Sequence, residues 1–292
     1  MEVEVRNMWN PDVVEKHMLG ARLGEAFSKT NQILGYIDEI RESVREKIVE
    51  ALVNRLTEAI GQYSIHSAIL TPMMFEELMI LKEYPELQQA VYQFTCNMLE
   101  LPKDRRPADE EVEITSLNNR KASLRLSYYT VKSMIDVLGS EEGTELWRDV
   151  VSLTHRDNRA NVEKALEMME SEGKTPPTVQ QMTQGMMKGW DAVGLANYVY
   201  TKLDDHKVLF RFDSCLVHDA LKDLNDPCIA YLCYCYTHDH SSFNFSRIHM
   251  RRTQTLHHGK FCDELYWDSE VHSNPEQPTL KFTKSLGKDL ED

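Results

Sequence analysis

The hydrophobic pattern of this chain changes character once, near His206. Before that residue, hydrophobic side chains recur every three or four positions, as in Ile33, Ile37, Ile40, Val44, Ile48, Leu52, Leu56 and Ile60. This spacing places them on one face of an α-helix. After it, hydrophobic residues alternate with others, which is typical of a β-strand, as in Val208, Phe210 and Phe212. We therefore expect an α+β protein, with a helical N-terminal part followed by a part that combines helices and strands.

The helical part is expected to begin with one long helix over residues 13–62. Its hydrophobic stripe can pack in a core or against a second chain, and we expect a homo-oligomer. Later stretches with helical spacing predict further helices at residues 86–99, 123–139, 140–153, 161–172 and 179–203. Glycine ends two of them, at Gly139 and Gly173.

Residues 101–114 are polar and charged and contain two prolines, so they predict a linker. The expected domains are a helical region at residues 1–100, available for oligomerisation, and an α+β domain at residues 115–292.

The C-terminal domain combines strand and helix signals. A strand is expected over residues 208–213, closed by Cys215. Residues 228–239 fit either a strand or a helix, and Asp226-Pro227 favours the helix, with aspartate as N-cap and proline in the first turn. Residues 245–254 and 261–267 alternate again and predict a hairpin around a turn at His257 to Gly259.

Composition limits the compartment and the partners. The formal net charge of -14 disfavours nucleic acid and anionic membranes, which need basic patches. No apolar run reaches the roughly 18 residues of a membrane span, and the first residues lack the pattern of a signal peptide. We expect a cytoplasmic protein. In that compartment its 6 cysteines are expected as thiols, ligands or nucleophiles rather than disulfides.

Soft and titratable side chains gather in the last third of the sequence. From Cys215 and His206 onward lie five of the 6 cysteines and eight of the 11 histidines. Four candidates can converge where the 228–239 helix meets the sheet, namely Cys215, Cys235, Asp239 and Cys262.

Three explanations of this group stay open. One cysteine can attack an electron-poor carbon with a histidine or carboxylate as acid and base. Thiols and imidazoles, among them His238 and His240, can hold zinc or iron, although no tight zinc spacing is present. The side chains can also be ordinary core residues.

Known cofactor motifs do not occur in the chain. It contains no dinucleotide fingerprint, no phosphate loop and no nucleophile elbow. We expect no cofactor, with zinc or iron as the possible exceptions. Arg251 and Arg252 are candidates to hold a substrate carboxylate, because a guanidinium binds that group in bidentate fashion.

The second half of the chain resembles the L-2-amino-thiazoline-4-carboxylic acid hydrolase family, which is similar to small-molecule-binding domains of the 4-vinyl-reductase type. The resemblance runs over residues 122–267 and is carried by four segments, at residues 137–143, 210–215, 235–239 and 255–262. It implies an antiparallel sheet with helices and hydrolytic opening of a small ring at a C–N or C–S bond.

By the same resemblance, the family's cysteine and aspartate positions fall on Cys215, Cys235, Asp239 and Cys262. Cys235 or Cys262 is then the expected nucleophile, with Asp239 as the base or orienting acid. The candidate substrate-binding residues are Arg251, Arg252, Thr255 and His238. Competing functions are a non-catalytic small-molecule or metal sensor and a Cys/His metalloenzyme.

Overall fold

The computed structural model describes residues 1–61, 78–101, 110–239 and 247–287. The chain folds into two compact units, Met1–Pro11 with Thr154–Asp292, and Asp12–Leu153. Most of the linker expected at residues 101–114, and His240, lie outside the described residues. The functional domain boundaries stay a prediction. No helix in the described ranges is long and apolar enough to cross a membrane.

The unit Asp12–Leu153 is built mainly from helices, and α2 packs against both α3 and α4. These helices are α1 (Leu19–Arg41), α2 (Arg45–Ile60), α3 (Pro85–Met98) and α4 (Ser116–Leu138), with short 3₁₀ turns η1 (Glu42–Val44) and η3 (Leu81–Glu83). A two-stranded sheet pairs β2 (Val14–Met18) with β3 (Glu111–Thr115).

The long helix expected over residues 13–62 is wrong in two places. Residues 14–18 form β2, because β3, almost a hundred residues later, supplies their hydrogen-bonding partner. The helical stretch is then broken at η1, so α1 and α2 are separate helices. The hydrophobic stripe lies mostly in the core of this unit, since Ile37, Ile48 and Leu56 are fully buried.

Helix α5 (Ser140–Ser171) is continuous, whereas the sequence predicted two helices there. Gly139 separates it from α4 and has a φ of +86°, a conformation that glycine adopts without strain. Gly143 lies directly against α4, where a Cβ atom would come within 2.7 Å of the Ile135 backbone. The predicted stop at Gly139 is therefore confirmed.

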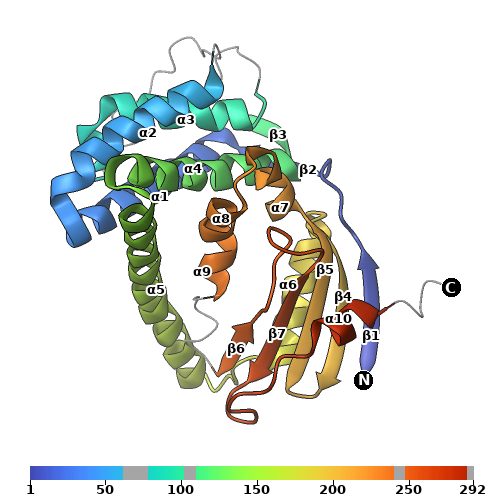
Figure 1. Ribbon diagram of the computed structural model, residues 1–292. Helices are drawn as coiled ribbons and strands as arrows, with labels where there is room; N and C mark the ends of the chain where they lie inside the picture. Colours follow the sequence, from blue (N-terminus) through green and yellow to red (C-terminus); the bar gives the residue numbers. More distant parts are fainter. Residues whose placement is uncertain (62–77, 102–109, 240–246, 288–292) are drawn as a thin grey trace. The chain divides into compact units, whose positions relative to one another are not determined.

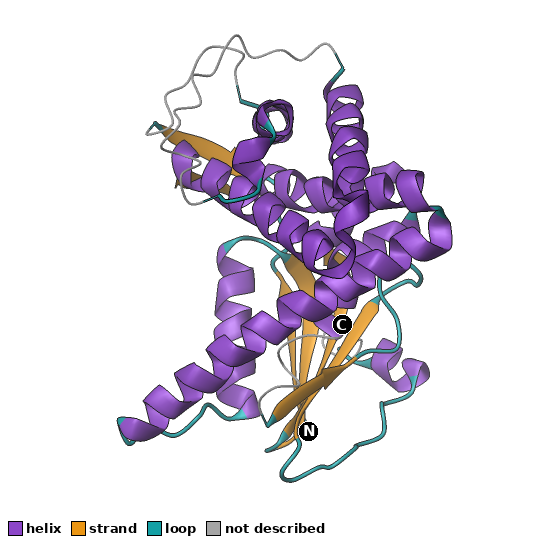
Figure 2. Ribbon diagram, turned by 90° about the vertical axis from the view of Figure 1, so that its left-hand side faces the viewer, coloured by secondary structure: helices purple, strands orange, loops and turns teal. Residues whose placement is uncertain are grey.

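The other unit contains a five-stranded antiparallel sheet (Figures 1 and 2). Its order is β1-β4-β5-β7-β6, from β1 (Glu2–Asn7), β4 (Ala196–Asp204), β5 (Lys207–Cys215), β7 (Cys262–Asp268) and β6 (Ile248–Arg251). The strand predicted at residues 208–213 and the pairing of the last two strands are confirmed. The expected α+β class is confirmed as well.

The helix expected over residues 179–203 is wrong in its second half. Helix α6 (Val179–Ala192) ends before Gly194, whose φ is +61°, and β4 follows. Tyr198 and Val199 are both buried because each face of this strand is covered, so no polar alternation marked it.

Alternation along the strands divides the two faces of the sheet. On one face, Trp190 of α6 makes edge contacts with Tyr198, Phe210 and Phe212. On the other face, Val199 and Leu265 belong to a cluster that includes Leu286 and is contacted by α10 (Leu280–Ser285). Helices α6 and α10 therefore flank the sheet (Figure 1).

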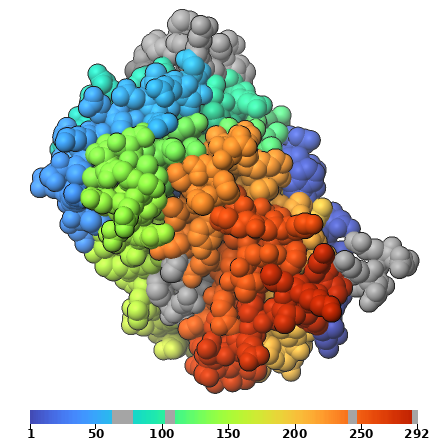
Figure 3. Space-filling model, viewed as in Figure 1, coloured from blue at the N-terminus to red at the C-terminus, as the bar shows by residue number. Residues whose placement is uncertain are grey.

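Residues 227–239 are helical throughout, as the Asp226-Pro227 pattern predicts. They form α8 (Pro227–Ala230), a π-helical stretch η5 (Tyr231–Cys235) and α9 (Tyr236–Asp239). They follow α7 (Leu216–Leu221) and η4 (Lys222–Leu224). In the space-filling view, the orange helical part of the chain lies beside the orange-red part that contains the last strands (Figure 3). The π turn shifts the helix faces. Cys228 is exposed, whereas Cys235 is buried.

Candidate functional site

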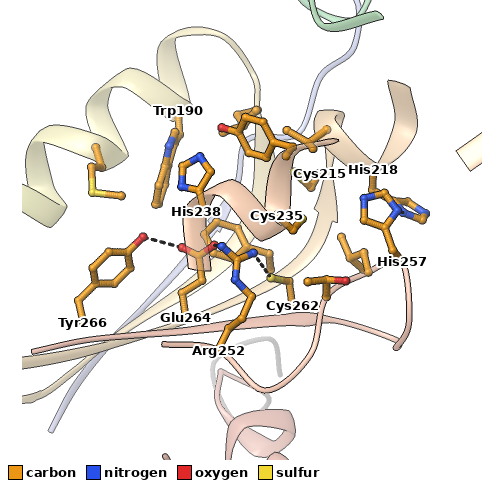
Figure 4. A pocket seen from close by; sticks show the side chains of 17 residues that line it. Trp190, Cys215, His218, Cys235, His238, Arg252, His257, Cys262, Glu264 and Tyr266 are labelled. Carbon is orange, nitrogen blue, oxygen red and sulfur yellow. Dashed lines mark hydrogen bonds and ion pairs between the residues drawn. The ribbon is translucent and has the colours of Figure 1, made fainter. Parts of the chain in front are cut away.

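One pocket lies on the face of the large sheet that α6 covers. Its volume is about 90 Å³, and it lies between that face, α6, the helical residues 227–239 and the loop after β6 (Figure 4). All of its lining residues belong to the unit that contains the sheet.

Strand β7 supplies three lining residues through its period of two. Cys262, Glu264 and Tyr266 face the pocket, while Asp263 and Leu265 point to the other side of the sheet. Tyr266 donates a hydrogen bond of 2.7 Å to Glu264 Oε2. A thiol, a carboxylate and a phenol thus stand in one row along the pocket wall.

Arg252 carries a buried positive charge into this row. Its side chain is only 6% exposed. The guanidinium pairs with Asp239 at 2.5 Å and with Glu264 at 3.2 Å, and its Nη1 lies 3.6 Å from Cys262 Sγ. Burial lowers the pKa of Arg252, but Glu264 and the neighbouring acids outweigh it and hold that pKa above its ordinary value. The cation is therefore permanent.

The segment that carries Arg252 is held by Asp263 from behind the sheet. Asp263 Oδ1 accepts the backbone N–H groups of Thr253 and Gln254, both at 2.9 Å. Its Oδ2 accepts the Thr253 hydroxyl at 2.6 Å and the Gln277 amide at 2.8 Å. These bonds fix the start of the loop and with it the position of Arg252.

The pocket thiols are held in the neutral form. Burial raises the pKa of Cys235 to about 12, against the opposing charge of Arg252. Burial also raises the pKa of Cys262 and of Cys215. None of the three is a standing thiolate at neutral pH, so a reaction through any of them needs a base.

Three histidines line the same pocket and are neutral at pH 7. Burial, helped by Arg252, lowers the pKa of His238 to about 4. Burial together with His218, His258 and Arg252 lowers the pKa of His257 to about 4, and burial also lowers that of His218. A neutral imidazole has a free ring nitrogen that can accept a proton.

Six of the eight predicted site residues line this pocket: Cys215, Cys235, Cys262, Arg252, Thr255 and His238. Asp239 does not line the pocket; it accepts a 2.6 Å hydrogen bond from Tyr231 and pairs with Arg252. Burial raises the pKa of Asp239.

Arg251 does not join the pocket residues. It binds Asn274 Oδ1 at 3.0 Å and the Pro275 carbonyl, and its guanidinium lies 5.2 Å from the centre of the Trp267 ring. The catalytic and binding roles of the eight residues stay predictions.

The residues present do not form a ready metal site. Within the described ranges, no three histidine, cysteine, aspartate or glutamate side chains are arranged to hold a metal ion. The possible ligand His240 lies outside those ranges. No disulfide joins the 6 cysteines, all of which lie in the described part of the chain.

Sequence reasoning missed several pocket residues. Glu264 and Tyr266 were detectable, because they follow Cys262 at the spacing of one strand face. Trp190 was hidden within a segment predicted as one long helix. His218 and His257 are in contact although they are 39 positions apart in the sequence, and no local pattern predicts such a contact.

Comparison with known proteins gives one match. The sequence model of the family described as L-2-amino-thiazoline-4-carboxylic acid hydrolase matches residues 119–266. These residues make up half of the chain and include every residue that lines the pocket. The match confirms the resemblance seen over residues 122–267. No curated protein and no solved structure matches the chain.

Proposed function

Because the chain belongs to the L-2-amino-thiazoline-4-carboxylic acid hydrolase family, we propose that it opens a small heterocycle by hydrolysis at a C–S or C–N bond. The substrate we propose first is the one in the family description, and the pocket beside β7 is the proposed reaction site. The observation that carries the proposal is the 3.6 Å contact between Arg252 Nη1 and Cys262 Sγ inside this pocket.

Cys262 is the nucleophile we favour, with Cys235 as the second choice. The fixed charge of Arg252 stabilises negative charge that develops on Cys262 during attack. The same guanidinium opposes the rise in the pKa of both thiols that burial causes. In this proposal Asp239 acts as a positioning residue, since its carboxylate pairs with Arg252 and receives the Tyr231 hydroxyl.

The proposed reaction begins with attack of the cysteine on the ring. The S–H bond of the cysteine breaks, its electron pair forms a bond to the ring carbon, and the proton passes to a base. The ring C–S or C–N bond breaks, and the leaving sulfur or nitrogen takes up a proton. Water then attacks the same carbon and releases the cysteine, so that one water is consumed per turnover.

The test is turnover of L-2-amino-thiazoline-4-carboxylic acid by the purified full chain. Mass spectrometry should show a product heavier by one water, and a colorimetric thiol assay should show one new thiol if the C–S bond opens. Cys262→Ser should lower kcat by about 1,000-fold or more. Cys228→Ala is the matched control, because that thiol is exposed on the same helical segment as Cys235.

Each negative result removes a different part of the proposal. Absence of turnover by the unmodified chain would reject this substrate. Full turnover by each of Cys215→Ser, Cys235→Ser and Cys262→Ser would show that water attacks the ring directly, and the thiols would then only line the pocket.

A second candidate is a pocket that binds a small molecule without catalysis. The neutral state of the three buried thiols favours it, since none of them is activated before a ligand arrives. A ligand that raises the melting temperature and is recovered unchanged would support this alternative.

A further inference from the structure

His218 and His257 form a close pair at one side of the pocket. Their Nδ1 atoms are 3.4 Å apart, and their ring centres are separated by 5.0 Å. His218 comes from α7, and His257 from the loop between β6 and β7. In the view of Figure 4, Cys235 and Cys262 lie between this pair and the group of Arg252 and Glu264.

A hydrogen bond between two neutral imidazoles fixes opposite tautomers. One ring must carry the proton on Nδ1 and donate it, and the other must accept with a bare Nδ1. The donor ring then has a bare Nε2, which is a base, and the acceptor ring has an Nε2–H, which is an acid.

The surroundings decide which ring donates. His218 is next to Asp219, whose charge raises the pKa of His218 against burial and against Lys222. His257 faces His218, His258 and Arg252, which all add to burial in lowering its pKa. His257 Nε2 is moreover buried without a partner among the described residues, where a bare acceptor costs less than an unpaired N–H, so His257 donates its Nδ1–H to His218.

The other nitrogen of His257 is available to a ligand. His257 Nε2 is buried and has no hydrogen-bond partner among the described residues. The same is true of the hydroxyl of Thr255, a residue only 4% exposed that also lines the pocket. Buried polar atoms normally have partners, so two orphaned atoms in one pocket point to a bound polar molecule.

We propose that His257 is the general base and acid of this pocket and that His218 is the positioning residue that receives its second proton. The inference rests on the proposed ring-opening function, and it names residues to which that function alone assigns no role.

The proton transfers form a closed cycle. As the nucleophile attacks, its proton passes to His257 Nε2, and the Nδ1 proton of His257 moves to Nδ1 of His218. His218 is then an imidazolium next to the carboxylate of Asp219. When the ring bond breaks, its electron pair takes the Nε2 proton of His257, and the Nδ1 proton returns from His218.

The first experiment observes the tautomers directly and needs no substrate. In the full chain labelled with ¹⁵N-histidine, long-range ¹H–¹⁵N spectra at about pH 7.5 should show both rings neutral. His257 should be the Nδ1–H tautomer and His218 the Nε2–H tautomer. Signals lost in His218→Asn and His257→Asn assign the two rings. Two rings of the same tautomer would overturn the proposal, and so would a spectrum that changes on addition of zinc.

The second experiment measures the role of His257 in turnover. His257→Ala should lower kcat by about 100-fold or more while KM changes little. Added imidazole should restore part of the lost rate, in proportion to its unprotonated fraction, because it can enter the space that the truncation leaves. His218→Asn should shift the pH profile of kcat with a smaller loss. A purely structural role would produce a loss of rate without rescue.

Lys260→Ala is the matched control, since it removes an exposed side chain of the same loop that does not line the pocket. It should keep the unmodified rate and show no response to imidazole. If the unmodified chain turns over substrate but His257→Ala and His218→Asn keep its rate, the proposed function stands and the histidine pair has no catalytic role. If the tautomers are as stated but no thiazoline is opened, the choice of substrate is wrong.

Discussion

Arg252 gives the pocket a positive charge that two carboxylates already compensate. Glu264 and Asp239 lie at 3.2 and 2.5 Å from it, so the group carries at most one net negative charge. Removing one partner from such a buried group leaves an uncompensated charge, which costs about 3–5 kcal/mol. Arg252 is therefore both a structural residue and the cation that the proposed mechanism requires.

The low pKa of His238 makes the stability of the fold sensitive to acid. Folded His238 takes up its proton at about pH 4, whereas an unfolded histidine does so near pH 6.5. Since the pKa of folded His238 is the lower one, the unfolded chain binds the proton first as the pH falls. The free energy of unfolding therefore keeps its full value above about pH 6.5 and decreases as the pH falls toward 4. The ring centres of His238 and Tyr234 are 4.5 Å apart. His238→Phe keeps an aromatic ring at this position, and phenylalanine cannot take up a proton.

Between about pH 6.5 and 4, we expect the free energy of unfolding of His238→Phe to decrease by on the order of 3 kcal/mol less than that of the unmodified chain. Urea unfolding at several pH values measures the difference from the unmodified chain. Lys260→Met, at an exposed position, should leave the pH dependence unchanged. Equal slopes for His238→Phe and the unmodified chain would contradict the prediction.

At the scale of elements, the helical residues 227–239 determine which thiol enters the pocket. Cys228 is exposed, whereas Cys235 is buried and lines the pocket. The helix start is set locally, since Asp226 accepts a hydrogen bond from the Ile229 N–H at 3.3 Å. The cap therefore positions Cys235, His238 and Asp239 through a single short element.

Loss of this cap should weaken the element. Asp226→Ala should lower the free energy of unfolding by about 1 kcal/mol, because one N–H at the helix start loses its partner. Asp226→Ser should recover most of the loss, since serine is also a good N-cap. Cys228→Ala, at an exposed position in the first turn of the same helical segment, is the control. Urea unfolding measures all three, and an unchanged stability of Asp226→Ala would show that packing alone fixes the helix.

At the scale of the whole molecule, the chain separates its hydrophobic stripe from its pocket. The stripe residues Ile48, Leu52 and Leu56 are buried inside the unit Asp12–Leu153. The pocket is lined only by residues of the unit that contains the five-stranded sheet. A homo-oligomer remains a prediction, and it would need surfaces other than the buried part of this stripe.

This separation predicts that a core defect in the helical unit spares the chemistry. Leu52→Ala should cost about 2–5 kcal/mol of stability, because the side chain is almost fully buried. The rate per folded molecule at 25 °C should equal that of the unmodified chain. Asn54→Ala, exposed on the same helix, should change stability by less than about 0.5 kcal/mol. Loss of turnover in folded Leu52→Ala would contradict the prediction, and unfolding curves with initial rates test both parts.

The sequence alone determined the features that depend on neighbours in the chain. The alternation of residues 208–213 was enough for β5, and Asp226-Pro227 was enough for the helix start, because strand faces and caps are local. The alternation of residues 261–267 places Cys262 on one strand face with Glu264 and Tyr266, and most cysteines and histidines lie in the third of the chain that contributes most of the pocket residues.

Only the tertiary structure decided the features that need distant partners. Val14–Met18 forms a strand because Glu111–Thr115 pairs with it. Strand β4 was predicted as helix because both of its faces are buried and its sequence does not alternate. The sequence likewise could not place His218 3.4 Å from His257, since they meet across 39 residues. Such contacts depend on how the whole chain closes around its core, which no local pattern records.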